Sequence, residues 1–360
     1  MRVLYASLYD ASFGKGGAEK VMVDILVAMK ERFGYDVACA VNKGDVSTEL
    51  GKMNIPLYQI EWSKLKLPAT LMQLNRAVRE FKPDVIHSHH RFTTFLFSLL
   101  VRHEAYLVHT EHVLRKDKKA LFRTGDIVTA VHESVRLNLI EHFGVDSGVV
   151  MTIDNAVPPH KVDPGKLSEL QKKWGTEDGK FDLLCIGRLE EQKGHRYLIE
   201  AVASLPLQMK NRLRVFLAGG GSLYVPLFRE IKENGLEDVV YLLGHCESVP
   251  EWLEYSDAVV LPSLWEGMPL SVLESFAAAK AVLATDIPGT RDMVEDHKTG
   301  RLVPPRDSEE LARVLRQWLD QEDKVREMGQ NAGRVWKEKY SFDIMMEAYR
   351  RCYEAGSERS

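Results

Sequence analysis

Short apolar runs alternate with amphipathic stretches along almost the whole chain, and this alternation constrains the fold most strongly. The runs are rich in Val, Ile, Leu and Ala, as buried parallel strands are. They comprise residues 3–6, 37–41, 85–87, 106–109, 127–131, 183–186, 215–218, 239–243, 258–261 and 281–284. Apolar side chains recur at helical spacing in residues 19–30, 71–81, 196–205 and 311–319. The pattern predicts an α/β protein with helices on both faces of parallel sheets.

The alternation is interrupted once, in a stretch after Asn155 that is rich in Pro, Gly and charged residues and ends before the strand at Leu183. Such a composition is typical of a domain junction. We therefore expect two doubly wound, Rossmann-like domains, residues 1–160 and 161–340, with a last helix in 341–360 that can pack back on the first domain. Ligands in such folds bind beside the carboxyl ends of the strands.

Composition and charge exclude several classes of protein. The chain carries 48 Lys plus Arg and 52 Asp plus Glu, a net charge of −4, which argues against a nucleic-acid-binding protein. The most apolar run, residues 92–101, is too short to span a membrane. No secretory signal is evident. Four scattered cysteines predict free thiols in a cytoplasmic protein: Cys39, Cys185, Cys246 and Cys352.

A glycine-rich turn at residues 14–17 separates the first predicted strand from the first predicted helix. Backbone N–H groups at such a turn, together with the helix dipole, suit an anion. The turn differs from the dinucleotide-binding fingerprint because Glu19 occupies the sixth position, and it is not a P-loop. Phosphate binding and simple close packing both explain these glycines.

Two cations follow the predicted strand at residues 183–186. Arg188 comes after Gly187, and Lys193 comes before Gly194 and a predicted helix. A guanidinium and an ammonium at the end of a strand can clamp a pyrophosphate. A solvated charged loop is the alternative.

Two acidic residues belong to the next motif. Glu266 lies in the loop after the strand at 258–261, Pro269 suits the first helical position, and Glu274 falls within an apolar helix. Burying Glu274 requires a partner that donates hydrogen bonds, as the hydroxyls of a ribose do. The alternative is a helix-start acid followed by a solvated glutamate.

These motifs occur in one order together with residues 109–112, 155–157 and 219–221. In this arrangement the sequence resembles the glycosyltransferase family 4 group of GT-B enzymes along nearly its whole length. The resemblance implies a retaining, metal-independent transfer from a nucleotide sugar, with an acceptor-binding first domain and a donor-binding second domain. It departs from the family at residues 288–292, where Asp292 replaces the usual Glu, and at Ala156, which replaces the usual Gly.

The resemblance also implies roles for individual residues. Arg188 and Lys193 hold the donor diphosphate, Glu266 contacts sugar hydroxyls, Glu274 holds the ribose, and His112 lies near the reacting sugar. Other residues complete the donor site: Gly187, Gly220, Gly267, Met268, Pro269 and Leu270. Gly16, Gly17 and Glu19 form an acceptor or phosphate loop.

Histidines gather at or just beyond predicted strand ends in the first domain: His87, His89, His90, His109 and His112. His87 and His89 share a face of one strand, which raises the question of a zinc site. Because no companion carboxylate or cysteine pair is evident, we expect neutral imidazoles in a polar site and no metal.

Charge is uneven along the chain. Residues 64–136 contain 13 Lys plus Arg and 7 Asp plus Glu. Such an excess attracts anionic lipid or a phosphate-bearing acceptor, while solvated helix and loop ends are the alternative explanation.

The sequence thus predicts a glycosyltransferase without a cofactor that moves a sugar from a nucleoside diphosphate donor, expected to be a UDP-sugar, to a glycan, glycolipid or similar acceptor in cell-surface synthesis. The alternatives are a catalytically silent nucleotide-sugar-binding scaffold and a GT-B epimerase or phosphorylase.

Overall fold

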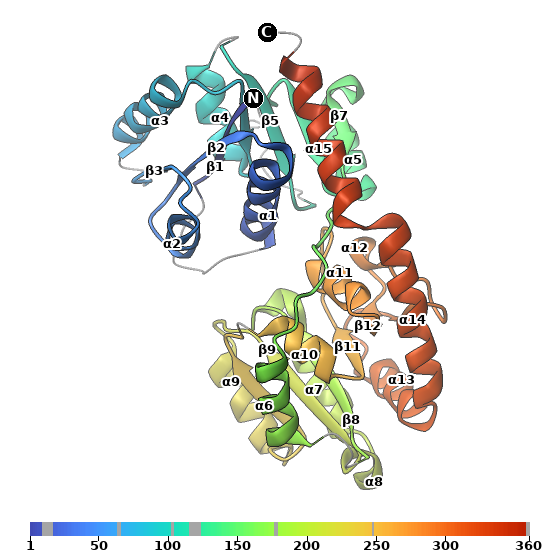
Figure 1. Ribbon diagram of the computed structural model, residues 1–360. Coiled ribbons are helices and arrows are strands. Elements are labelled where there is room, and N and C mark those ends of the chain that lie inside the picture. Colours follow the sequence, from blue (N-terminus) through green and yellow to red (C-terminus); the bar gives the residue numbers. More distant parts are fainter. Residues whose placement is uncertain are drawn as a thin grey trace. The chain divides into compact units, whose positions relative to one another are not determined.

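The chain forms two compact units, each built around its own parallel sheet (Figure 1). The computed structural model describes residues 1–8, 17–62, 66–101, 104–114, 124–175, 179–246 and 248–357. One unit comprises residues 1–156 and 342–360, and the other comprises residues 157–341. Within the described ranges, no helix has the length and apolar character needed to cross a lipid bilayer.

The first unit contains a seven-stranded sheet in the order β3-β2-β1-β4-β5-β6-β7, in which every neighbouring pair is parallel. Its strands are β1 (Arg2–Ser7), β2 (Asp36–Val41), β3 (Leu57–Gln59), β4 (Val85–Ser88), β5 (Tyr106–Glu111), β6 (Ile127–Ala130) and β7 (Val150–Thr152). Its α-helices are α1 (Gly17–Phe33), α2 (Asp45–Lys52), α3 (Leu67–Phe81), α4 (Arg91–Leu100), α5 (Glu133–Leu137) and α15 (Phe342–Ser357).

The second unit contains a six-stranded parallel sheet in the order β10-β9-β8-β11-β12-β13. Its strands are β8 (Phe181–Ile186), β9 (Leu213–Ala218), β10 (Val240–Gly244), β11 (Ala258–Leu261), β12 (Ala281–Thr285) and β13 (Gly300–Val303). Its α-helices are α6 (Pro164–Trp174), α7 (His195–Ala203), α8 (Leu207–Lys210), α9 (Tyr224–Glu233), α10 (Val249–Tyr255), α11 (Leu270–Ala277), α12 (Pro288–Arg291), α13 (Ser308–Asp320) and α14 (Glu322–Lys339).

Local sequence signals explain where several of these helices begin and end. The side chain of Asp307 accepts a 2.9 Å hydrogen bond from the backbone of Glu310 and so caps the N-terminus of α13. Helix α3 ends at Phe81, where the next residue, Lys82, has a left-handed backbone conformation and is followed by Pro83. The apolar face of α13, including Leu311, Leu315 and Trp318, packs into the core of the second unit.

The structure confirms the predicted α/β class and differs from the predicted elements in two respects. It adds three short strands, β3, β7 and β13, each at an edge of its sheet. The stretch predicted to be a junction also contains a helix, α6. Asp163 caps this helix through hydrogen bonds from the backbones of Gly165 and Lys166, and Pro164 occupies its first turn.

The C-terminal helix α15 belongs to the first unit, where it packs against α1, β4 and β5. Its buried face carries Tyr349 and Tyr353, both fully buried. Gly356 is held against the ring of Tyr106, since an added Cβ would approach within 2.0 Å of that ring. Close packing of this kind fixes the last helix of the chain beneath the first sheet.

Candidate active site

The carboxyl ends of β8, β9, β11 and β12 lie at one edge of the second sheet because these strands are parallel. The chain order reverses between the neighbouring strands β8 and β11. Such a reversal leaves room for a ligand beside the strand ends. The loops that follow these four strands contain most of the residues to which the sequence analysis assigned donor binding.

Glycines allow the loops after β8 and β9 to approach each other closely. An added Cβ at Gly219 would lie 1.9 Å from the carbonyl oxygen of Gly187, and one at Gly221 would lie 2.4 Å from that of Leu189. Gly220 is different, because an added Cβ there meets nothing within 4 Å. Packing therefore requires Gly219 and Gly221, whereas Gly220 borders open space.

Lys193 lies across the start of the loop that follows β8. An added Cβ at Gly187 would lie 3.2 Å from the side-chain stem of Lys193. The Nζ atom reaches Oε1 of Glu266 at 2.6 Å. Gly194 follows with φ of 63°, and an added Cβ there would lie 2.1 Å from the carbonyl oxygen of Pro262. Only glycine fits this contact, so it fixes the lysine loop against the end of β11.

Glu266 accepts hydrogen bonds from three side chains although it is only 8% exposed. The donors are Lys193, the hydroxyl of Ser263 at 2.8 Å and, more weakly, the amide of Gln192 at 3.4 Å. Gly289 also packs directly against this loop, because an added Cβ at Gly289 would lie 2.7 Å from the carbonyl oxygen of Glu266. The Glu266 carboxylate is therefore well oriented before any ligand binds.

Arg188 contrasts with Lys193. Its side chain is exposed, and it has no hydrogen bond or ion pair within the part of the chain that the structure describes. The carboxylate of Glu190, the next acidic residue, is bonded to another residue, since it accepts hydrogen bonds from the backbone N–H and the hydroxyl of Ser222. These bonds, with a smaller contribution from the charge of Arg188, lower the pKa of Glu190. Arg188 is thus available to bind an external anion.

Helix α11 buries the second predicted acid. Glu274 is 7% exposed, and its carbonyl oxygen accepts a 2.6 Å hydrogen bond from Nε2 of His160. Pro269 caps this helix from the position before Leu270, one residue earlier than the sequence predicted. Proline is compatible with the helix start at this position as well as at the first helical position, because the helix needs no backbone N–H from either one.

The start of α11 also contains a hydroxyl that the sequence analysis missed. Oγ of Ser271 is buried and has no hydrogen-bond partner within the described residues. Gly267 and Met268 are buried just before it, and Leu270 is half-buried. An unpaired hydroxyl beside the free N–H groups of a helix N-terminus can donate to an anion. Its position two residues after Pro269 was the signal available in the sequence.

The predicted acceptor or phosphate loop lies largely outside the described residues, Gly16 included. Gly17 is the first residue of α1. Glu19 is buried in the first turn, and its Oε1 accepts a 3.4 Å hydrogen bond from the hydroxyl of Ser7 at the end of β1.

The predicted histidine group lies on the adjacent strands β4 and β5 and just beyond them. The rings of His87 and His89 are 4.1 Å apart, and Nδ1 of His89 lies 3.0 Å from Nε2 of His112. Burial lowers the pKa of His112 to about 4, opposed by the nearby Glu111 carboxylate. His90 precedes α4. Among the residues described, no group of three or more His, Cys, Asp or Glu is placed to hold a metal ion.

His87 is part of a buried polar network rather than an open site. Its Nδ1 lies 2.6 Å from the hydroxyl of Tyr353, and its Nε2 lies 2.6 Å from Oγ1 of Thr110. Thr110 in turn bonds Thr129 at 2.6 Å and Tyr349 at 3.3 Å. The network ties α15 to β4, β5 and β6. No local signal predicted it, because its members come from distant parts of the sequence.

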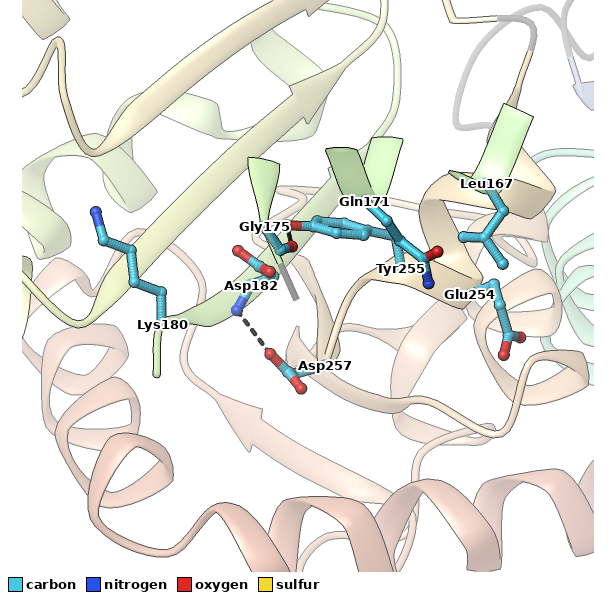
Figure 2. Close-up of a pocket in the computed structure, with 8 residues that line it drawn as sticks. All are labelled: Leu167, Gln171, Gly175, Lys180, Asp182, Glu254, Tyr255 and Asp257. Atoms are coloured by element: carbon cyan, nitrogen blue, oxygen red, sulfur yellow. Dashed lines mark hydrogen bonds between the residues drawn. The ribbon is translucent and has the colours of Figure 1, made fainter. Parts of the chain in front are cut away.

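A polar pocket of about 170 Å³ lies at the opposite edge of the second sheet, where β8 and β11 begin, and Figure 2 shows residues that line it. The backbone N–H of Asp182 donates to Asp257 at 2.8 Å, and the Asp182 carboxylate pairs with Arg214. Tyr255 closes the network by donating to the carbonyl of Gly175. Because these groups bond one another and lie far along the strands from Lys193, the pocket is a structural feature of the fold.

Family comparisons cover both units of the chain. Residues 168–335 match the family described as Glycosyl transferases group 1, and residues 15–161 match the one described as Glycosyltransferase Family 4. The two matches together extend over most of the sequence.

Individual relatives agree with these families. An alpha-D-kanosaminyltransferase of Streptomyces kanamyceticus is 31% identical over 48% of this chain and 45% of its own length. A UDP-Gal:alpha-D-GlcNAc-diphosphoundecaprenol alpha-1,3-galactosyltransferase of Escherichia coli is 29% identical over 73% of each chain. The first match thus spans less than half of that relative, whereas the second spans most of both proteins.

Solved structures share the fold. The crystal structure of HepE from Anabaena in complex with UDP and glucose is similar, with a TM-score of 0.85 and 21% identity over 98% of this chain and 99% of that one. Sucrose-phosphate synthase from Thermosynechococcus elongatus gives a TM-score of 0.84 at 17% identity, with both chains fully covered (100% and 100%). The likeness confirms the predicted GT-B fold of two Rossmann-like sheets.

Proposed function

The chain belongs to the glycosyltransferase family 4 group of GT-B enzymes, which use nucleotide-sugar donors, and we propose that it transfers a hexose from a UDP-sugar to an acceptor hydroxyl with retention of configuration. The acceptor is a glycan, glycolipid or related molecule of cell-surface polysaccharide or glycoconjugate synthesis. Both relatives described above have the names of sugar transferases, and the name of the Escherichia coli relative includes a UDP-sugar, which supports the class of reaction.

One observation carries the proposal: a buried carboxylate and two differently placed cations occupy the strand ends of the second unit. Lys193 is bonded to Glu266, while Arg188 is exposed and unpaired within the described residues. When the bond between the sugar and the diphosphate breaks, negative charge grows on the leaving phosphate. Arg188, Lys193 and the N–H groups at the start of α11 would stabilise that charge. No carboxylate nucleophile is needed.

The remaining residues of the second unit have orienting roles in this proposal. Glu266 accepts hydrogen bonds from sugar hydroxyls, and Glu274 holds the ribose. The donor is further enclosed by Gly187, Gly220, Gly267, Met268, Pro269 and Leu270. Residues 161–340 therefore form the donor-binding domain, and residues 1–160, with Gly16, Gly17, Glu19 and His112, form the acceptor-binding domain.

The uridine base is proposed because UDP occurs in the name of the Escherichia coli relative and in the HepE complex. Thermal unfolding in the presence of UDP-, GDP- and ADP-sugars tests it. A donor at 100 times its Kd stabilises the protein by about 2.7 kcal/mol. Stabilisation by a GDP- or ADP-sugar alone would contradict the uridine assignment and leave the glycosyltransferase assignment intact.

Turnover is tested by following UDP release from the donor without an acceptor. A transferase hydrolyses its donor slowly, whereas a catalytically silent scaffold releases no UDP. Mass spectrometry of the product then separates transfer from its GT-B alternatives. A free isomerised sugar would indicate an epimerase, and a sugar phosphate would indicate a phosphorylase.

We further propose that the transfer needs no metal ion, because Arg188 and Lys193 can supply the positive charge for the diphosphate. Excess EDTA should leave kcat/KM unchanged. A loss of activity that added Mg²⁺ or Mn²⁺ restores would contradict this proposal.

We also propose a cytoplasmic protein that contacts anionic membrane through its basic region. Cys39, Cys185 and Cys352 are buried cysteines that form no disulfide, as is usual in reducing compartments. Several basic side chains of residues 66–136 form ion pairs with acidic residues: Lys66–Glu61, Arg76–Glu80, Arg91–Glu111 and Arg136–Glu133. The contact is proposed for the basic region of residues 64–136, of which residues 115–119 lie outside the described residues. Replacing Lys116, Lys118 and Lys119 by Gln should weaken binding to phosphatidylserine vesicles, and unchanged binding would contradict it.

A further inference from the structure

His89 and His112 form a hydrogen-bonded pair of imidazoles in the first unit. Nδ1 of His89 lies 3.0 Å from Nε2 of His112, and the two rings are nearly parallel, with 26° between their planes. His89 follows β4 and is 5% exposed, whereas His112 follows β5 and is half-buried. One ring must donate its N–H to the other, and the direction of this bond decides what His112 can offer a ligand.

Both rings are neutral near pH 7. Burial lowers the pKa of His112, the Glu111 carboxylate raises it and His109 lowers it, and together they bring it to about 4. Burial likewise holds the pKa of His89 well below its ordinary value, with contributions from His87, His112 and His109. Arg91 pairs with Glu111 from α4. Each ring of the pair therefore carries one N–H and one bare nitrogen.

The second nitrogen of His89 indicates the direction of the bond. Nε2 of His89 is buried and has no hydrogen-bond partner within the described residues. If His112 donated, the proton of His89 would sit on Nε2 as a buried, unpaired N–H. If His89 donates from Nδ1, Nε2 keeps only a lone pair. Buried donors without a partner are rarer in proteins than buried acceptors without one.

We propose that His89 is a positioning residue that donates from Nδ1 to Nε2 of His112 and so keeps the His112 proton on Nδ1. Nδ1 of His112 has no partner among the described residues and thus presents an N–H donor. In the proposed transferase, His112 then acts as a hydrogen-bond donor to a sugar oxygen and not as a general base. The sugar oxygen as the partner of His112 rests on the proposed function, whereas the direction of the His89–His112 hydrogen bond does not.

The direction is tested by NMR on the full chain with ¹⁵N-labelled histidine rings. The His112 signals are assigned by their loss in His112→Gln. Between pH 6 and 8 we expect a protonated Nδ1 and a bare Nε2 on His112. A protonated Nε2, or signals averaged between the two tautomers, would overturn the proposal. Because this readout needs no activity, it is independent of whether the chain is a glycosyltransferase.

The consequence for turnover is tested with two matched variants. His89→Asn keeps an N–H donor near the position of Nδ1, whereas His89→Asp offers only an acceptor. Both remove the same ring from its contact with His87, so a merely structural role predicts equal losses. We expect kcat of the Asn variant to exceed that of the Asp variant by at least about tenfold. We also expect kcat of the Asp variant to titrate between pH 5 and 8, because a carboxylate raises the pKa of His112.

Equal kcat values for the two variants, measured well below both midpoints of thermal unfolding, would overturn the positioning role. A pH profile of the Asp variant that matches the wild type would do the same. Donor affinity, measured by UDP binding, serves as the folding control and should be unchanged in both, because His89 lies in the other unit from Lys193 and Glu266.

Discussion

Nζ of Lys193 donates a 2.6 Å hydrogen bond to Oε1 of Glu266, although 73 residues separate the two in the sequence. Both side chains are largely buried, with 16% and 8% exposed. A diphosphate that attracts the ammonium of Lys193 therefore also acts on the carboxylate of Glu266. The proposed binding of the phosphates by Lys193 and the proposed orientation of the sugar by Glu266 would thus be linked through this one bond.

Arg188→Ala should impair activity without affecting stability. Its guanidinium has no partner among the described residues, so its removal should change the free energy of unfolding by no more than about 0.5 kcal/mol. Loss of a cation from the leaving diphosphate should lower kcat/KM by at least about tenfold. Steady-state UDP formation and urea unfolding measure the two effects. A kcat/KM within about threefold of wild type, ~0.7 kcal/mol, would show that Arg188 does not bind the donor.

Lys193→Ala should impair both activity and stability. The change leaves the buried carboxylate of Glu266 without its cation, although Ser263 still donates to it. We expect a loss of about 2 kcal/mol in the free energy of unfolding and a fall in kcat/KM larger than that for Arg188→Ala. The same two measurements apply. An unchanged free energy of unfolding would mean that the pair contributes nothing to the fold.

Gly289→Ala should displace the loop that holds Glu266. An added Cβ would lie 2.4 Å from the carbonyl oxygen of Gly267 and 2.7 Å from that of Glu266. The backbone must move, so we expect a loss of about 1 to 3 kcal/mol in stability and a higher KM for the donor. Gly51→Ala in helix α2 is the control, because an added Cβ there would come no closer than 3.9 Å to its nearest neighbour, the side chain of Leu57 in β3. Equal effects of both changes would show that the close approach is unimportant.

Glu111→Gln should change how stability depends on pH. Burial raises the pKa of Glu111, but His109 and the Arg91 guanidinium outweigh burial and lower it to about 2. A carboxylate with a lowered pKa contributes stability above pH ~4.5 and loses it as the pH falls towards 2. At pH 7 the free energy of unfolding of the variant should be lower than that of the wild type by on the order of 3 kcal/mol. Between pH 5 and 2 the variant should lose less stability than the wild type does.

Urea unfolding at several pH values measures this effect of Glu111. Glu80→Gln is the control, because the ion pair of Glu80 with Arg76 is exposed. Exposed pairs contribute little, so this variant should follow the wild-type curve. If Glu111→Gln also follows the wild-type curve, the carboxylate does not stabilise the fold.

Tyr353→Phe should destabilise the first unit more than Tyr349→Phe. The Tyr353 hydroxyl is the partner of Nδ1 of His87 at 2.6 Å, and its loss leaves a buried ring nitrogen unpaired. We expect Tyr353→Phe to lower the free energy of unfolding by about 1 to 3 kcal/mol. Tyr349 bonds Thr110 at 3.3 Å, and Thr110 keeps shorter bonds to His87 and Thr129. Chemical denaturation compares the variants, and equal losses would contradict the network described.

Much of the fold was predictable because local sequence patterns indicate its helices and strands. Continuous apolar runs identified central strands such as β1 and β8, since a strand buried on both faces needs apolar side chains on both. The strands that were not predicted, β3, β7 and β13, are short and lie at sheet edges. Edge strands have fewer buried neighbours, so their sequences carry a weaker signal.

Burial at the candidate site was predictable in part, but the contacts of the site were not. The apolar surroundings of Glu274 in the sequence predicted its burial, and the structure confirms that burial. Nothing near Lys193 in the sequence indicated Glu266 as its partner, or Gly289 as the support of the Glu266 loop. Such contacts form only when parallel strands bring their loops to one edge.

The sequence by itself therefore determined the class of fold, the family and the chemical types present at the strand ends, because periodicity and motif spacing are local properties of the chain. Only the tertiary structure decided which cation is paired and which is exposed, that α15 packs beneath the first sheet through Tyr353 and His87, and that His89 bonds His112. These relationships join residues far apart in the chain, and their geometry depends on how every strand between them packs.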